Sequence, residues 1–277
     1  MTVHHLHLVS DSTGETVSSV ARSVMVQFDT VEVEEHFWAL VRTKHQVDKV
    51  VEGIAKHVGF VLYTIADPEL RGYLNQKCQK LNVPCVSVLS RIVSDLSSFF
   101  GVKPTGQIGR QYELNEEYFS RVEAINFALT HDDGQSVWDL EEADIIVVGV
   151  SRSSKSPTSM YLAFRGFRAA NVPYVPKVPL PEILTTLRKP LIVGLTINPE
   201  ILVQIRTNRL LSLNEDRAGM YTNLEEVEEE VLDARKYFLK HGWPIIDVTR
   251  RSVEETAAKM IQMYQSKKEK EEAGHGA

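Results

Sequence analysis

The chain has 277 residues, of which 43% are hydrophobic and 25% are charged, a composition typical of globular proteins. At about 100–200 residues per domain, this length favours two domains. Its 31 Lys and Arg residues against 37 Asp and Glu residues give a net charge of −6, and this argues against nucleic-acid binding because phosphate contacts need a basic surplus. No apolar run approaches the ~20 residues of a membrane span, and the two cysteines exclude a disulfide scaffold and a four-cysteine zinc site. We therefore expect a cytoplasmic protein with reduced thiols and without membrane or nucleic-acid partners.

Over the first hundred residues, short strand patterns alternate four times with helix patterns. Strands are expected near residues 6–9, 33–40, 60–65 and 85–89. Ser12 and Glu15 have the spacing of a capping box, and Asp67 with Pro68 supplies the start of the third helix. The second helix is expected to bury Val47, Val50, Val51, Ile54 and Val58. Repeated strand-then-helix order predicts an α/β domain with a parallel, Rossmann-like sheet.

A stretch with three glycines and a proline, residues 101–109, interrupts this alternation. Such a concentration of turn-forming residues predicts a linker or a long loop. We therefore expect an N-terminal α/β domain over residues 1–105 and a second domain over residues 106–277.

The second half of the chain has its own strands and helices. Strands are expected at residues 144–148, 191–195 and 245–248, where the apolar runs are typical of strands buried on both faces. Three helices are expected to bury the following stripes: Tyr118, Val122, Ile125 and Leu129; Met160, Ala163, Phe164 and Phe167; and Leu224, Val227, Val231, Ala234 and Phe238. Ser252 and Glu255 form a second capping box, and the charged tail from Ser266 is expected to fray.

The most specific chemical motif lies between the strand at 144–148 and the next helix. It consists of Gly149, Val150, Ser151, Arg152, Ser153, Ser154, Lys155 and Ser156. A loop in this position directs main-chain amides and the positive end of a helix dipole at one volume, which favours phosphate. Lys155 is expected to neutralise the terminal phosphate oxygens, and the hydroxyl of Ser156 to bind Mg²⁺. Ser154 stands where such loops usually have glycine, the residue that reaches a positive φ without cost.

Two other interpretations of this loop stay open. Its serines are also suited to cap the helix in an ordinary polar turn. The order Gly149-Val150-Ser151 after a strand resembles the nucleophile elbow of hydrolases, but that motif needs glycine where Ser153 stands and leaves Lys155 without a role.

Other polar residues are weaker candidates for the same chemistry. His131, Asp132 and Asp133 could move a proton or hold Mg²⁺, although they also suit a helix end followed by a turn. Asp247 ends a strand, as the Mg²⁺-binding Asp of phosphate-loop enzymes does. Arg206 and Arg209 share a helix face and could clamp phosphate oxygens, or simply lie in solvent.

Three histidines near the N-terminus do not predict a metal site. Alternation along the strand sends His4 to the face opposite His5 and His7, and the sequence indicates no further ligand.

Several longer motifs, taken together and in order, resemble the bifunctional regulatory kinase/phosphorylases that act on pyruvate, phosphate dikinase or on phosphoenolpyruvate synthase. They lie at residues 10–16, 127–134, 149–157 with 159–163, 196–200 with 205–206, and 244–249 with 254–257. The resemblance runs over nearly the whole chain. Members of that family carry Ser-Lys-Ser or Ser-Lys-Thr in the loop, as residues 154–156 do here.

The resemblance implies a P-loop kinase-like catalytic domain and two opposed activities. In the first, ADP phosphorylates and inactivates a threonine of a dikinase whose catalytic histidine is already phosphorylated. In the second, inorganic phosphate removes that phosphoryl group and releases pyrophosphate. Implied with them are Mg²⁺, the dikinase as protein partner and a homodimer, with Lys155, His131 and either Asp132 or Asp133 as catalytic groups.

Three alternatives stay open beside this prediction. The target could be phosphoenolpyruvate synthase, the protein could sense an adenine nucleotide without catalysis, or it could be a small-molecule kinase that uses ATP. Pyruvate, phosphate dikinase is favoured on general likeness.

Overall fold

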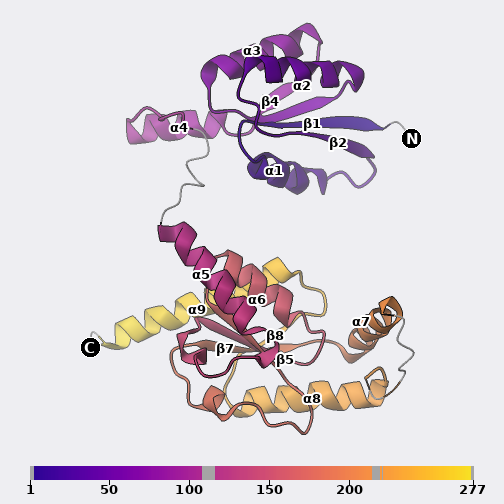
Figure 1. Ribbon diagram of the computed structural model, residues 1–277, viewed down its shortest axis with the longest axis vertical. Coiled ribbons are helices and arrows are strands. Elements are labelled where there is room, and N and C mark those ends of the chain that lie inside the picture. Colours follow the sequence, from indigo (N-terminus) through magenta and orange to yellow (C-terminus); the bar gives the residue numbers. More distant parts are fainter. Residues whose placement is uncertain (1–2, 108–115, 214–218, 220, 276–277) are drawn as a thin grey trace. The chain divides into compact units, whose positions relative to one another are not determined.

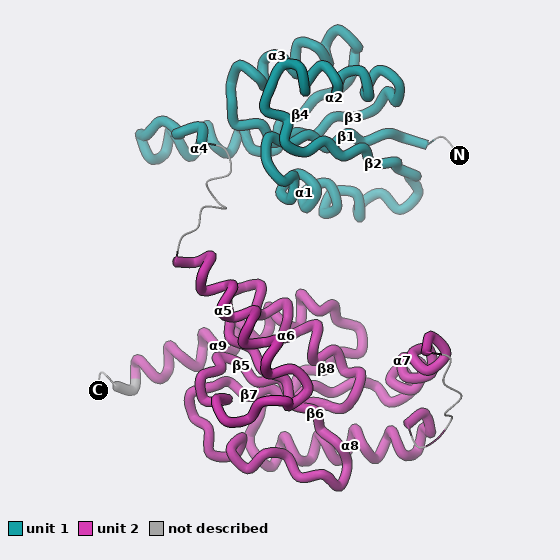
Figure 2. The backbone as a smooth tube through the Cα atoms, in the orientation of Figure 1, with its two compact units in different colours: residues 1–113 teal, residues 114–277 magenta. Residues whose placement is uncertain are grey.

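The computed structural model describes residues 3–107, 116–213, 219 and 221–275. The chain divides into two compact units, residues 1–113 and residues 114–277 (Figure 2). Each unit contains a four-stranded sheet in which all described strand pairs are parallel, with helices packed on it (Figure 1). The predicted α/β class is therefore confirmed. Among the described helices, none has both the length and the apolar character to cross a membrane.

Unit 1 alternates strands and helices as the sequence predicts. Its elements are β1 (His4–Ser10), α1 (Glu15–Met25), β2 (Val33–Trp38), α2 (Lys44–Lys56), β3 (Phe60–Thr64), α3 (Pro68–Lys80), β4 (Cys85–Ser87) and α4 (Ser90–Phe100). The strands lie in the order β2-β1-β3-β4. The chain thus extends the sheet first to one side of β1 and then to the other, which creates a topological switch point between β1 and β3.

Alternation along β1 places its side chains in two different cores. Leu6 and Leu8 pack with Val17 of α1 on one face of the sheet. Val9 faces the other way and packs with Val47 and other apolar residues of α2 and α3. Both faces of the sheet are therefore covered, as the interior of a parallel sheet requires.

Two local predictions for unit 1 are wrong and one is confirmed. Helix α1 begins at Glu15 after Gly14, whose φ of 81° turns the chain directly into the helix, so Ser12 and Glu15 do not form a capping box. Val58 lies beyond the end of α2 and is 65% exposed. The side chain of Asp67 does cap α3, where it accepts hydrogen bonds from the first-turn amides.

Unit 2 is larger and has the same strand pattern. Its elements are α5 (Glu116–Thr130), the short 3-10 helices η2 (Asp132–Gly134), η3 (Leu140–Glu142) and η4 (Glu182–Thr185), β5 (Ile145–Gly149), α6 (Lys155–Phe164), β6 (Ala169–Pro173), β7 (Leu191–Thr196), α7 (Pro199–Ser212), α8 (Leu224–Lys240), β8 (Ile245–Asp247) and α9 (Val253–His275). The strands lie in the order β6-β5-β7-β8, so β5 and β7 are central. β6 was not predicted, because alanine and asparagine favour strands only weakly.

The inward faces predicted for α5 and α6 are wrong in part: Ala163 is buried as predicted and Ile125 and Phe167 are partly buried, but the other predicted residues are exposed. The two helices meet through Ala124 and Ala128 of α5 and Ala163 of α6. Small side chains allow close approach of two helices, and the larger apolar residues lie beside the contact, so that Leu129 is 59% and Phe164 57% exposed. Tyr118, Val122 and Met160 are exposed as well.

The last helix begins as predicted and ends later than predicted. The amide of Glu255 donates to Ser252 Oγ over 3.1 Å and the amide of Ser252 donates to Glu255 Oε2 over 3.0 Å, which confirms the second capping box. Helix α9 then continues through Ser266 to His275, where the sequence predicted a frayed tail.

Candidate phosphate-binding site

The turn between β5 and α6 has the backbone form of a strand–loop–helix anion site. Arg152 and Ser154 adopt φ angles of 68° and 63°, in the left-handed region. A Cβ atom on Gly149 would lie 2.7 Å from Ser153 Oγ and 3.2 Å from Leu195 O, so a larger residue would force the loop or its side chains to shift. Ser154 therefore holds the conformation of the glycine that usually stands at this position.

The N-terminal end of α6 supplies main-chain donors. An α-helix leaves the amides of its first turn without intrahelical acceptors, and its dipole places partial positive charge there. The helical hydrogen bonds of α6 begin with Thr158 N to Ser154 O at 3.1 Å, and Pro157 carries no N–H. The amides of Lys155 and Ser156 are thus the ones that the helix itself does not use.

Lys155 brings a nearly enclosed cation to this helix end. Its side chain is only 5% exposed, and Nζ donates a hydrogen bond to Val150 O at 3.0 Å. Burial lowers its pKa to about 8, against the opposing attraction of Asp133 and Asp132. A buried ammonium group is expensive unless an anion accompanies it, so this lysine suits a phosphate ligand.

Asn171 joins the phosphate loop to the acidic turn, and sequence reasoning missed it. It lies on β6, opposite Val147 of β5. Its Nδ2 donates to Asp132 Oδ1 and lies 3.4 Å from Ser156 Oγ, while its Oδ1 accepts from Asp133 N at 3.1 Å. The available signal was a single amide side chain inside the apolar segment 169–173.

His131 is held by its own neighbours. It is 1% exposed, its Nδ1 lies 2.8 Å from Phe127 O, and its Nε2 lies 2.6 Å from Asp139 Oδ1. Its carbonyl oxygen accepts from Asn171 N at 3.1 Å. Both ring nitrogens thus face protein acceptors, and the geometry favours a role in positioning the acidic turn over proton transfer at the loop.

The two arginines predicted as a phosphate clamp lie in different surroundings. Arg206 is 1% exposed and forms a two-pronged ion pair with Glu230, at 2.7 and 2.9 Å. It also donates to Ser151 O at 3.1 Å and stacks over the ring of Tyr221. Arg209 is exposed. Arg206 and Arg209 therefore do not form one clamp, and Arg206 instead supports the loop through its hydrogen bond to Ser151 O.

Asp247 lies away from the predicted magnesium ligand Ser156. It ends β8, the edge strand beyond β7, and its carboxylate accepts from the amide of Thr249 at 2.9 Å. With neighbouring strands ~4.8 Å apart, the two strand spacings from β8 across β7 to β5 amount to ~10 Å. Asp132 and Asp133, on the other side of β5, are the carboxylates that the structure places near Lys155.

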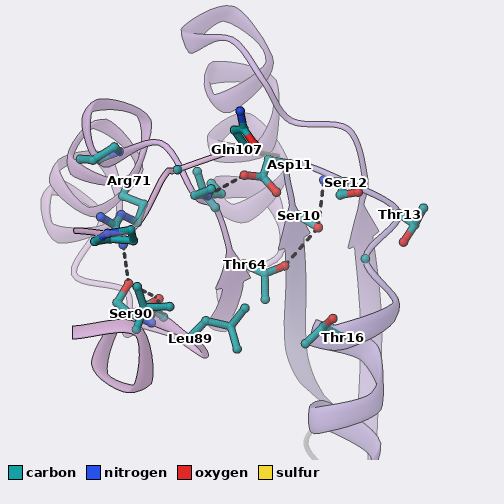
Figure 3. A pocket seen from close by; sticks show the side chains of 18 of the residues that line it. Ser10, Asp11, Ser12, Thr13, Thr16, Thr64, Arg71, Leu89, Ser90 and Gln107 are labelled. Atoms are coloured by element: carbon teal, nitrogen blue, oxygen red, sulfur yellow. Dashed lines mark hydrogen bonds between the residues drawn. The ribbon is translucent and has the colours of Figure 1, made fainter. Parts of the chain in front are cut away.

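Unit 1 contains a separate cavity of about 340 Å³. It lies where β1, β3 and β4 end, at the switch point of the sheet, and the segment 10–16 forms much of its wall (Figure 3). Thr64 Oγ1 donates to Ser10 Oγ at 3.1 Å, and Arg71 donates to Ser90 Oγ at 2.8 Å. From its residues the sequence analysis assigned this segment a helix cap, and it also counted the segment among the motifs of the family resemblance. The cavity has hydroxyl groups and one arginine, but it lacks the buried lysine and the loop geometry of unit 2.

A parallel sheet with a glycine at a central strand end and a buried lysine at the following helix start is an arrangement typical of phosphoryl-transfer proteins. The family model described as Kinase/pyrophosphorylase matches residues 6–261 of this chain. The chain belongs to the Kinase/pyrophosphorylase family. Membership supports a kinase or phosphotransferase activity in general.

Relatives of similar length match nearly all of the chain. A protein of Paramagnetospirillum magneticum is 52% identical over 96% of this chain and 86% of its own length. A protein of Maricaulis maris is 49% identical over 96% of this chain and 95% of its own length. A protein of Novosphingobium aromaticivorans is 47% identical over 98% of this chain and 97% of its own length. All three carry the name pyruvate, phosphate dikinase regulatory protein.

Proposed function

We propose that this protein regulates pyruvate, phosphate dikinase through two opposed phosphoryl transfers at the loop 149–156. In one, ADP donates its β-phosphoryl group to a threonine of the dikinase and leaves as AMP. In the other, inorganic phosphate attacks the phosphothreonine and leaves as pyrophosphate. The names of the relatives and the family support the target and the reaction class.

The buried lysine is the observation that carries this proposal. Phosphoryl transfer needs positioning and positive charge on the phosphoryl oxygens more than covalent chemistry. Lys155 supplies that charge at the N-terminal end of α6, where the helix dipole acts in the same direction. The outermost phosphoryl group of ADP would occupy this position in the first reaction, and the attacking inorganic phosphate in the second.

The acidic turn is suited to accept the proton of the attacking threonine. When the hydroxyl oxygen bonds to phosphorus, the bond to the bridging oxygen of ADP breaks and the hydroxyl proton moves to a carboxylate. Asp132 and Asp133 lie near Lys155, and Asn171 fixes both of them. Either aspartate fits this role.

The oxygen donors here also fit Mg²⁺. Asn171 Nδ2 contacts both Ser156 Oγ and Asp132 Oδ1, so a hydroxyl and a carboxylate lie around one amide group. Mg²⁺ prefers such oxygen ligands and usually shares them with substrate phosphates, whose charge it offsets. Ser156 and Asp132 are therefore the residues that would hold it.

A homodimer belongs to this proposal as well. Helix α4 has no buried residue, and its apolar side chains Ile92, Leu96, Phe99 and Phe100 are 45–83% exposed. Apolar surface of this kind is typical of association sites. Light scattering of the purified chain measures its molar mass. A monomer at all concentrations would refute the homodimer and leave the proposed phosphoryl transfers unaffected.

The transfer assay uses ADP labelled in its β-phosphate and a dikinase that carries phosphohistidine. We expect label on a threonine of the dikinase with the wild-type protein, and a loss on the order of 10²–10³-fold for Lys155→Met, because a preorganised charge at the transferred group is removed. Lys189→Met, which changes an exposed lysine of the same unit, is the matched control and should keep full activity.

Three further arms test the alternatives. Unlabelled threonine with tight ADP binding would refute catalysis and indicate a nucleotide sensor. Transfer from ATP without a protein acceptor would indicate a small-molecule kinase. Transfer to phosphoenolpyruvate synthase but not to the dikinase would refute the proposed target and keep the chemistry.

A further inference from the structure

Four imidazole rings gather at the amino ends of the strands in unit 1, at the end of the sheet opposite the cavity. His5 and His7 share one face of β1, and His36 lies on the neighbouring strand β2, where it pairs with His7. His57 follows α2 and comes from the turn that leads into β3. The expectation that His5 has no partner ligands is therefore wrong, because the partners come from segments distant in the sequence.

Ligand nitrogens of three of these histidines lie close together, and a carboxylate lies beside two of them. His5 Nδ1 lies 3.1 Å from His36 Nε2, and ligand atoms of His5, His36 and His57 all lie within 4.8 Å of one another. Oxygens of Glu34, which is paired with His5 across the strands, lie 3.6 Å from His5 Nδ1 and 4.0 Å from His36 Nε2. Donors around a tetrahedral zinc ion, with Zn–N bonds of about 2.0–2.1 Å, lie ~3.3 Å apart.

Neighbouring groups hold the cluster in this arrangement. Trp38 Nε1 donates to His7 Nδ1 at 3.2 Å, so His7 carries its proton on Nε2 and donates it to His57 O at 2.7 Å. This bond fixes the main chain of His57, the one ligand that lies in a turn. Outer hydrogen bonds of this kind orient the ligands of protein metal sites.

The approach of the turn to β1 is also built into the chain. A Cβ atom on Gly59 would lie 2.0 Å from the carbonyl oxygen of His5, so only glycine allows the turn after α2 to reach the strand.

We infer that His5, His36 and His57, with Glu34 as the fourth ligand, form a structural site for a transition-metal dication, of which Zn²⁺ is the best fit. Three imidazoles and one carboxylate fill a tetrahedral shell, which is the rule for structural zinc sites. Imidazole ligands select zinc and its neighbours in the transition series, whereas Mg²⁺ prefers oxygen. The ion would join β1, β2 and the turn before β3. The inference does not depend on the proposed phosphoryl transfer in unit 2.

The test is a titration of the untagged, chelator-treated full chain with Zn²⁺, measured by calorimetry and by metal analysis after gel filtration. We expect one Zn²⁺ per chain, and binding weaker by more than ~10-fold in His36→Gln and in His57→Gln. His4→Gln is the matched control, because His4 is exposed and its side chain lies on the opposite face of the same strand. Mg²⁺ should not compete.

Co²⁺ identifies the ligands directly. Four-coordinate Co²⁺ absorbs strongly in the visible range, and nitrogen and oxygen ligands give no thiolate charge-transfer band. Such a band would assign the ion to the contacting thiols of Cys78 and Cys85 and refute the inference. Absence of stoichiometric binding, or binding that survives both His36→Gln and His57→Gln, would refute it as well. Circular dichroism of each variant verifies that it is folded.

Discussion

Replacement of Lys155 by methionine should make unit 2 more stable while it removes activity. The ammonium group lies in a nearly closed environment, and burial lowers its pKa from 10.5 to about 8. A shift of this size corresponds to ~3 kcal/mol of unfavourable free energy for holding the charge at pH 7, at ~1.4 kcal/mol per pH unit. Methionine has a similar length and no charge. We expect Lys155→Met to raise the free energy of unfolding at pH 7 by about 1–3 kcal/mol.

The sign of the pH dependence separates this cause from better packing. Below pH 8 the lysine is charged in both the folded and the unfolded chain, and the full penalty applies. Between about pH 8 and 10.5 the folded chain loses the proton while the unfolded chain keeps it, so wild-type stability rises with pH. The advantage of the methionine variant should therefore be constant below pH 8 and shrink toward zero by pH 10.5.

Urea unfolding followed by the fluorescence of Trp243 provides the measurement. Trp243 is 9% exposed in the core of unit 2, and a background with Trp38→Phe and Trp138→Phe removes the other two tryptophans. Lys189→Met in the same background should leave stability unchanged. A methionine variant that is less stable than wild type at pH 7, or whose advantage is the same at pH 7 and pH 10.5, would refute the reasoning.

Three other variants and conditions test the loop and its support. Ser154→Gly should raise the free energy of unfolding by about 0.5–1 kcal/mol, because glycine adopts a φ of 63° without the strain that serine bears there; a loss of stability in the same urea assay would contradict this. Arg206→Met should lower the free energy of unfolding by about 3–5 kcal/mol, because it leaves Glu230, whose side chain is 12% exposed, buried without its partner. The double variant Arg206→Met with Glu230→Gln should recover much of this loss. Equal stabilities of the single and double variants would argue against a stabilising ion pair. ADP affinity, measured by calorimetry, should be nearly constant below pH 8 and fall by about tenfold per pH unit above it as free Lys155 loses its proton, whereas in Lys155→Met it should not change across that range.

Most strands and several helix starts could be predicted from the sequence because their signals are local. The apolar run 145–149 is fully buried as β5, and Asp67 caps α3 through its own neighbouring amides. Local spacing also identified the loop that starts α6. Each of these features depends on residues a few positions apart, which the sequence displays directly.

Features that depend on distant partners could not be predicted. The inward face of α5 was assigned to large apolar residues, whereas Ala124 and Ala128 form the contact with Ala163 of α6 because close approach of the helices matters more than side-chain size. Arg206 was expected either to clamp phosphate or to lie in solvent, and it is instead buried and neutralised by Glu230, on another helix. Asn171 connects the phosphate loop and the acidic turn only because its strand, β6, pairs with β5. The sequence did not reveal β6.

The two sheets repeat one connection pattern although the sequence shows no repeat. Relative to chain order, both place the second strand first, then the first, the third and the fourth. Each unit consequently has a switch point at the ends of its central strands, where unit 1 has the cavity lined by the segment 10–16 and unit 2 has the loop 149–156. If a saturation experiment finds two molecules of a small ligand per chain, this repeated architecture explains the number, and mutating the segment 10–16 and the loop 149–156 separately would assign each molecule to its unit.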